Sequence, residues 1–495
     1  MNTPIYDFVK NYVFRNPVRL HMPGHKGNYD VARGFKDSWM SRIAKYDITE
    51  IDGADYLSAP CGIIAKSEAN ASGIFGCNTF YSTEGSSLCI RAMMFLLKKY
   101  AKQRGHEAYV LAGRNAHASF VNACAVLDID VEWIMQRECD SYEVCRMTGA
   151  ELDSILNSII KKPDAVYVTS PDYLGNMLDI GELAKVCHRH GVLLLVDNAH
   201  GAYLKFLKNS LHPIDIGADM CCDSAHKTLP VLTGGAYLHI AHTENPESDA
   251  ATALSEDLGI STDQIIARDF FRKNARQALS IFATTSPSYL ILQSLDLCNQ
   301  FLDGNTVIRR CADKTEALRK KLEENGYCIT GDEPLKLTIS FTEKESASNT
   351  CNILFDLLFE NGIYVEYHDS EHMVMMFSDG TTDAEFEKVE NVLLLFLRQI
   401  RKEGFVKKNR SDMEDNARKK PPIRAMSFKE AMFASSEQAD AVNSIGRILA
   451  QPVLNCPPCV PIYMCGEVIG DDIKKYCTGK VTVVSGGVEK NNNTW

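Results

Sequence analysis

Short apolar segments alternate with helical patterns as far as residue 240. The segments are AYVLAG (108–113), DAVYVTS (164–170), VLLLVDNAH (192–200) and GGAYLHI (234–240). Their length and their β-branched content predict strands. A helical pattern lies between two of them and ends before Gly191, with spaced positions at Leu183, Val186, Cys187 and His190. This alternation predicts an α/β fold with a mainly parallel sheet and helices on both faces.

The pattern changes after residue 300. A helical pattern covers Thr306–Asn325, and two short strands are predicted in PLKLTISF (334–341) and MVMMF (373–377), which indicates a smaller α+β unit. The charged run KKNRSDMEDNARKKPPIR (407–424) ends in a Pro pair and has no apolar periodicity, so we expect a linker or an exposed loop. Residues 425–480 form a third ordered piece, and SGGVEKNNNTW is expected to fray.

Composition narrows the class of protein. The chain has 495 residues, which exceeds one hydrophobic core, and its 45% hydrophobic and 24% charged residues are typical of globular proteins. A net charge of −11 disfavours nucleic-acid and anionic-membrane partners. The 17 cysteines follow no disulfide framework, the N-terminus lacks a signal-peptide core, and no apolar run suits a membrane helix. We therefore expect a cytoplasmic protein without nucleic-acid or membrane partners.

Lys227 and Asp197 are the first candidates for chemistry. Lys227 lies in SAHKTLP (224–230), at the exit of the apolar stretch GADMCC, where an unpaired ammonium is costly to desolvate. Such a lysine either reaches water as an ordinary surface residue or forms an imine with an aldehyde. Asp197 ends the run VLLLV, where ligands collect in open α/β sheets. It either caps the following helix or keeps a pyridine nitrogen protonated.

Two further motifs suit an aromatic phosphate. In STEGSSLCIRAMMFLLKK (82–99), Gly85, Ser86 and Ser87 stand at the start of a predicted helix, where free N–H groups and hydroxyls bind anions. Ser and Gly at a helix start are also ordinary capping residues. His117 follows a predicted strand in GRNAHASF (113–120) and either stacks on a ring or serves as a structural hydrogen-bonding residue.

In this order along the chain, these motifs resemble those of the fold-type-I, pyridoxal-phosphate-dependent ornithine/lysine/arginine decarboxylases, in the short bacterial form that lacks an N-terminal wing domain. The resemblance covers nearly the whole chain. It is carried by HMPGHKG (21–27), DITEIDGADYLSAPCGII (47–64), STEGSS (82–87), GRNAHAS (113–119), VDNAHGAY (196–203), SAHKTLP (224–230), TTSPSYL (284–290) and SIGRILAQPVLNCPPCVPIYMCGEVI (444–469).

The resemblance implies a role for each matching residue. Lys227 would hold pyridoxal 5′-phosphate (PLP) as a Schiff base, Asp197 would pair with the pyridinium nitrogen, and His117 would stack on the ring. The phosphate would be held by Gly85, Ser86, Ser87 and Ser224. His200 would lie near the ring hydroxyl, and His226 matches the family beside Lys227. Ser286 would reach the phosphate of a neighbouring subunit, which implies a homodimer or a higher homo-oligomer with a shared active site.

The implied reaction is α-decarboxylation of arginine, lysine or ornithine, as in polyamine biosynthesis. Glu467 resembles a residue that meets the distal cation of the substrate, and Glu366 or Asp369 is the alternative. An aminotransferase or aldolase on the same fold would use the same lysine and aspartate, but would be expected to clamp the substrate carboxylate with an arginine. A noncatalytic PLP-binding protein has no reason to keep these residues together.

The expected division of the chain is an N-terminal arm (1–60), a PLP-binding large domain (61–298), a small α+β domain (299–406), a linker (407–424) and a C-terminal decarboxylase-type segment (425–495). One departure from the family is CPPC at 456–459, where a glycine commonly follows the Pro pair. Cys456, Cys459 and Cys465 lack the fourth ligand and second close pair of a zinc site, so we expect no metal.

Overall fold

A computed structural model describes residues 1–28, 39–136, 141–242, 259–304, 306–341, 344–402 and 422–486. Most of the predicted linker at 407–424 and most of the predicted frayed tail lie outside the described residues. None of the described helices combines the length and the apolar character that a membrane crossing requires.

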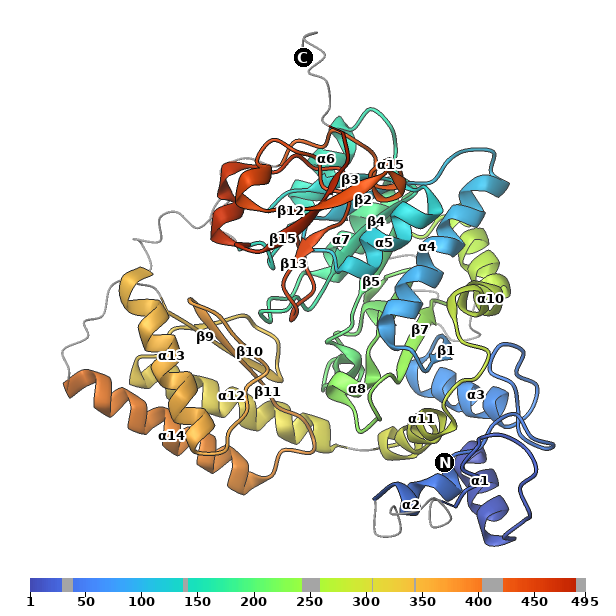
Figure 1. Cartoon of the computed structure of the whole chain (residues 1–495). Helices are drawn as coiled ribbons and strands as arrows, with labels where there is room; N and C mark the ends of the chain where they lie inside the picture. The colour runs from blue at the N-terminus through green and yellow to red at the C-terminus, as the bar shows by residue number, and fades with distance from the viewer. Residues whose placement is uncertain are drawn as a thin grey trace.

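A seven-stranded sheet forms the centre of the molecule (Figure 1). Its order is β1-β7-β6-β5-β4-β2-β3. The neighbours β6, β5, β4, β2 and β3 pair in parallel, whereas β7 runs antiparallel to β1 and to β6. The strands are β1 (Asn78–Ser82), β2 (Tyr109–Gly113), β3 (Asp130–Ile134), β4 (Ala165–Thr169), β5 (Leu193–Asp197), β6 (Met220–Asp223) and β7 (Ala236–Ile240). The predicted α/β fold with a mainly parallel sheet is confirmed.

Helices cover both faces of this sheet. One face packs against α3 (Ile63–Phe75), α6 (Gly149–Ser158), α7 (Ile180–Arg189) and α11 (Tyr289–Leu302). The other packs against α4 (Gly85–Gln103), α5 (Ala118–Leu127), α10 (Thr262–Phe282) and α15 (Phe428–Phe433). Alternation along β5 sends Leu194 and Val196 to the first face and Leu193 and Leu195 to the second. The same period directs Asp197, the last residue of β5, toward the face that carries α4 and α5.

The chain before the sheet packs against the first face. Its elements are α1 (Pro4–Phe14), α2 (Trp39–Ile43) and the 3₁₀ turn η1 (Ala44–Tyr46). The Asp296 carboxylate of α11 accepts the Ile5 and Tyr6 N–H groups at 2.9 and 3.0 Å, which satisfies donors that the first turn of α1 leaves open.

The smaller unit is a four-stranded antiparallel sheet backed by helices, in the order β10-β11-β9-β8. Its elements are α12 (Val307–Asn325), β8 (Ile329–Thr330), β9 (Lys336–Ser340), α13 (Lys344–Glu360), β10 (Tyr367–His368), β11 (His372–Met376) and α14 (Asp383–Lys402). The helix expected at Thr306–Asn325 and both expected strands are present.

The C-terminal segment packs on the large sheet near β2 and β3 (Figure 1). Besides α15 it contains β12 (Ser436–Asp440), η5 (Val442–Ser444), β13 (Val453–Leu454), β14 (Pro461–Tyr463), η6 (Asp471–Lys475) and β15 (Lys480–Val484). The Arg114 guanidinium, just after β2, donates to the Pro461 carbonyl at 3.0 Å and to the Ile462 carbonyl at 3.3 Å. The residue boundaries that we expected for the five parts of the chain stay a prediction.

Candidate active site

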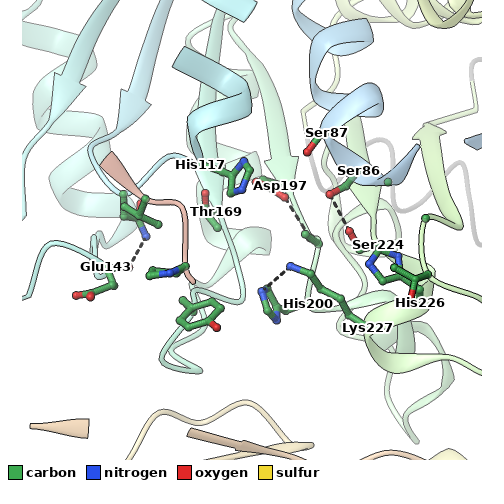
Figure 2. Close-up of a pocket in the computed structure, with 18 of the residues that line it drawn as sticks. Ser86, Ser87, His117, Glu143, Thr169, Asp197, His200, Ser224, His226 and Lys227 are labelled. Atoms are coloured by element: carbon green, nitrogen blue, oxygen red, sulfur yellow. Dashed lines mark hydrogen bonds between the residues drawn. The ribbon is translucent and has the colours of Figure 1, made fainter. Parts of the chain in front are cut away.

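A cavity of about 340 Å³ opens at the carboxyl ends of β4, β5 and β6 (Figure 2). This is the edge of an α/β sheet where ligands usually bind. The structure brings together at this cavity the predicted residues Gly85, Ser86, Ser87, His117, Asp197, His200, Ser224, His226 and Lys227. They come from helix starts, strand ends and the short helix α8 (Ala225–Thr228), which lies between β6 and β7.

Lys227 extends from α8 into the cavity, and its Nζ lies 3.0 Å from His200 Nε2 (Figure 2). The side chain is accessible through the open cavity, but protein atoms surround it densely. This desolvation lowers the pKa of Lys227 from its usual value near 10.5, and the negative charge of Asp197 only partly opposes the effect. A larger share of the amine is therefore neutral, which is the nucleophilic form that an aldehyde requires.

Asp197 is 2% exposed at the end of β5. Its Oδ2 accepts the Tyr167 hydroxyl at 3.3 Å, and its Oδ1 accepts the Ala199 N–H at 3.2 Å and the Cys222 thiol at 3.7 Å. Within the described part of the chain the carboxylate forms no ion pair. A buried carboxylate is stabilised by a cationic partner, so the geometry suits a protonated ring nitrogen in the cavity.

His117 caps the N-terminus of α5, where its Nδ1 accepts the Ser119 N–H at 3.1 Å. Burial lowers the pKa of His117, and the nearby Asp197 carboxylate opposes this shift. The imidazole is therefore predominantly neutral near pH 7, with Nδ1 as the acceptor. A neutral ring held at this position can stack on an aromatic ligand without burying a charge.

Hydroxyl and N–H donors gather at the start of α4. Gly85 is the first residue of this helix, with φ +71°, and its N–H donates to the Gly234 carbonyl at 2.8 Å. Ser86 Oγ lies 2.7 Å from Ser224 Oγ, so hydroxyls from two elements meet in front of the helix (Figure 2). The first N–H groups of a helix lack intrahelical acceptors, so this corner can bind an anion such as a phosphate monoester.

Comparison with known proteins identifies the family. The family model for Orn/Lys/Arg decarboxylase, major domain, matches residues 3–337. The chain belongs to the Orn/Lys/Arg decarboxylase family. An arginine decarboxylase of Bacillus subtilis (strain 168) is 27% identical over 493 residues, which cover 96% of this chain and 92% of that protein. A lysine decarboxylase structure from Francisella novicida superposes with a TM-score of 0.73 at 17% identity and covers 97% of this chain and 80% of that one.

The chain is thus a PLP-dependent decarboxylase of basic amino acids. The cavity fits PLP, which carries an aldehyde, a pyridine nitrogen, a ring hydroxyl and a phosphate. The amine of Lys227, the carboxylate of Asp197 and the donors at the start of α4 would hold the aldehyde, the ring nitrogen and the phosphate. Within the described residues the buried Thr169 Oγ1 and His200 Nδ1 have no hydrogen-bond partner, so polar atoms remain for a ligand.

Several lining residues of the decarboxylase were not predicted. Thr169 ends β4 and pairs in register with Asp197, so the rule that ligands bind at strand ends was sufficient to select it. Asn115 lies beside His117 in the quoted motif, and its Nδ2 donates to the Glu143 carbonyl at 3.2 Å. Glu143 and Tyr173 had no signal in the sequence, because only the fold brings their loops to the cavity.

Two predicted residues of the decarboxylase lie away from this cavity. Ser286 is exposed in the loop between α10 and α11 and does not line the cavity of its own chain. Glu467 is 3% exposed and forms a buried ion pair with Arg114, with Glu467 Oε2 3.0 Å from Arg114 Nη2. Glu366, one of the alternatives to Glu467, accepts the Tyr173 hydroxyl at 3.1 Å. The roles given to these residues stay predictions.

The three cysteines of the motif at 444–469 separate into two groups. Cys465 is buried, and its thiol faces the Phe428 carbonyl at 3.8 Å. Cys456 and Cys459 lie in a loop whose Pro458 lines the cavity. All the described cysteines are free thiols.

Proposed function

We propose that this decarboxylase converts arginine to its amine and carbon dioxide, with lysine and ornithine as the alternative substrates. The observation that carries the reaction is the convergence of Lys227, Asp197 and His117 on one cavity at the strand ends. Arginine comes first because relatives from Bacillus subtilis and Halalkalibacterium halodurans that are similar over almost the whole chain are named arginine decarboxylases.

Each of the lining residues would have a separate role in binding PLP. Lys227 would bind the aldehyde carbon of PLP, Asp197 would hold the proton on the ring nitrogen, and His117 would stack on the ring. Ser86, Ser87 and Ser224, with the N–H groups at the start of α4, would bind the phosphate and fix the orientation of the ring.

Bound PLP supplies the electron sink that accepts the electron pair left behind when the substrate carboxylate departs. Lys227 would deliver a proton to the substrate, because its Nζ lies in the cavity, where it is 3.0 Å from His200 Nε2. Burial and the cation of Lys227 hold the pKa of His200 well below its usual value, so His200 accepts a hydrogen bond from the protonated amine and does not repel it.

The lining of the cavity argues against an aminotransferase or aldolase. Among the described residues that line it there is no arginine to clamp a substrate carboxylate, whereas Glu84, Glu143 and Asp197 contribute acids. Acidic walls favour a substrate with a distal cation.

Glu467 and Glu143 are candidates for the contact with that cation, beside the alternatives Glu366 and Asp369. Glu467 is the acid that the resemblance implies, but in this chain its charge is already balanced by Arg114. Glu143 lines the cavity, and among the described residues its buried Oε1 accepts no hydrogen bond of normal geometry, although the Ser141 and Tyr142 hydroxyls lie near the carboxylate. Burial raises the pKa of Glu143, and a substrate cation would reverse this shift.

The proposed assembly is a cytoplasmic homodimer in which Ser286 of one subunit reaches the phosphate of the other. Exposure of Ser286 outside the cavity of its own chain supports this role.

The test is incubation of the purified protein with arginine, lysine and ornithine while amine and carbon dioxide are both followed. Equal amounts of amine and carbon dioxide from one of the three support the proposal. Transfer of the amino group without carbon dioxide release would reject decarboxylation in favour of the aminotransferase.

A further inference from the structure

The loop 455–460 forms part of the cavity wall and is attached to the helix that carries His117. Pro458 and Val460 of this loop line the cavity. The Cys459 carbonyl accepts the Ala118 N–H at 2.9 Å, in the first turn of α5. Any movement of this loop is therefore transmitted both to the cavity wall and to the helix start that holds His117.

Two thiols meet within this loop. The Cys459 N–H donates to the Asn455 carbonyl at 2.8 Å, which closes the turn. Closure brings the Cys459 thiol beside that of Cys456, and this neighbour contributes to the raised pKa of Cys459. Cys459 has φ +59°, a left-handed conformation that residues other than glycine seldom adopt. The turn thus holds the two sulfur atoms close together at the edge of the active site.

The accessibility of this pair is unusual for the chain. Most described cysteines are buried, whereas Cys456 is exposed and Cys459 is partly exposed. The other adjacent pair, Cys221 and Cys222, is fully buried in β6 and points to opposite faces of the sheet. An oxidant in solvent therefore reaches the loop pair and not the pair in the sheet.

A metal site does not account for the pair. Among the described residues, the groups of three or more potential ligands consist of His212, Asp223 and His239 alone, and these lie in the core. Cys456 and Cys459 therefore lack the third and fourth protein ligands of a structural zinc site.

We propose that Cys456 and Cys459 are a redox-active dithiol that peroxide converts to an intrachain disulfide, and that this disulfide lowers the turnover of the decarboxylase. The closure of the turn and the access of solvent carry the first half of the proposal. The position of the loop in the cavity wall carries the second half.

The chemistry needs peroxide as the oxidant and proceeds in two balanced steps. The exposed Cys456 sulfur attacks one peroxide oxygen, the O–O bond breaks, and a sulfenic acid and one water form. The Cys459 sulfur then attacks the Cys456 sulfur, the S–S bond replaces the S–O bond, and the second water carries away the thiol proton. Burial and the neighbouring Cys456 raise the pKa of Cys459 to about 11, so the exposed Cys456 is the residue that meets peroxide first.

The disulfide changes the geometry of the wall. An S–S bond is about 2.05 Å long, well below the van der Waals separation of two sulfur atoms that are not bonded, so the loop has to contract when it forms. Pro458 and Val460 move with it, and the hydrogen bond from Ala118 to Cys459 is strained. Misplacement of a substrate-orienting wall by even a small distance slows catalysis.

The experiment treats the holoenzyme with hydrogen peroxide, blocks the remaining thiols by alkylation, and maps the peptides without reduction. We expect a peptide with a Cys456–Cys459 disulfide, a severalfold loss of activity, and recovery of both with dithiothreitol. Cys456→Ser should keep its starting activity and resist peroxide. Cys459→Gly, which suits the positive φ, removes the other thiol and should resist in the same way.

Cys61→Ser is the matched control, because Cys61 is also exposed but lies outside the cavity lining. This variant should respond to peroxide as the wild type does. The proposal is overturned if the map lacks the disulfide or if activity is unchanged when the disulfide is present. It is also overturned if peroxide lowers the activity of Cys456→Ser as much as that of the wild type. Zinc bound in a 1:1 ratio to the wild-type chain and lost in the Cys456→Ser variant would also overturn the proposal. Peptide mapping reads the thiols directly, so its result does not depend on the proposed substrate.

Discussion

Arg114 and Glu467 form a buried ion pair, 3.0 Å between Arg114 Nη2 and Glu467 Oε2, although 353 residues separate them in the chain. Arg114 follows β2, and Glu467 belongs to the C-terminal segment, so the pair attaches that segment to the large sheet. The Met464 N–H donates a further hydrogen bond to Glu467 at 2.7 Å. The carboxylate therefore already has a full set of partners within its own chain.

Glu467→Gln should destabilise the protein and leave the choice of substrate unaltered. Removal of the carboxylate charge leaves the Arg114 guanidinium buried without its partner, a change that costs about 3–5 kcal/mol when such pairs are broken. Urea unfolding measures this loss. A variant with wild-type stability that loses kcat/KM selectively for arginine, lysine and ornithine would instead support a substrate contact at Glu467.

Glu143→Gln is the matching substitution at the cavity. In contrast to Glu467→Gln, it should weaken the reaction with the substrate and leave stability unaltered. Loss of a charge-assisted contact of about 1.5–3 kcal/mol lowers kcat/KM for the cationic substrate by about one to two orders of magnitude. Stability should stay near that of the wild type, because no buried cation is left without a partner. An unchanged kcat/KM would remove Glu143 from substrate recognition.

Lys227 should carry the cofactor. The purified protein should be yellow, and borohydride should fix the cofactor irreversibly to Lys227, because its amine has a lowered pKa and faces the cavity. Peptide mapping after reduction locates the modified lysine. Lys227→Ala should lose detectable turnover while it folds normally by circular dichroism. A label on a different lysine would contradict the assignment.

Asp197→Asn should bind the cofactor but react slowly. The amide keeps the shape of the side chain, whereas the charge that holds the proton on the ring nitrogen is lost, so we expect kcat to fall by about two to three orders of magnitude. Cofactor content per chain from the absorbance spectrum and steady-state kcat separate binding from chemistry. Turnover close to that of the wild type would show that Asp197 has no part in the mechanism.

The stability of the apoprotein should fall as the pH drops below about 6.5, in part because of His200. Burial and nearby cations hold the folded-state pKa of His200 well below the ordinary value of 6.5 for histidine. Between pH 6.5 and the lower folded-state pKa, His200 binds a proton in the unfolded chain but not in the folded chain. The free energy of unfolding therefore decreases by up to about 1.4 kcal/mol for each pH unit that the pH falls. His200→Gln should reduce this slope in urea unfolding at several pH values. An unchanged slope would mean that His200 is protonated in the folded protein.

Local patterns were sufficient for most of the fold and for the centre of the site. The apolar segments that contain β2, β4, β5 and β7 were readable because a strand buried on both faces must be continuously apolar. Lys227 and Asp197 could be predicted because a charged side chain at the end of such a strand has a high desolvation free energy, which suggests a function. Gly85, Ser86 and Ser87 were readable because a helix start leaves donors unsatisfied.

Contacts between distant segments were decided only by the tertiary structure. Glu143 and Tyr173 reach the cavity through loops that have no periodic signal, and the C-terminal loop 455–460 joins the wall through Pro458, Val460 and the hydrogen bond from Ala118 to Cys459. Likewise, no pattern near Glu467 shows that Arg114 neutralises it. Periodicity and residue type report the environment of each residue along its own element, whereas the partner across the fold depends on how the elements pack, and packing is set by the whole chain at once.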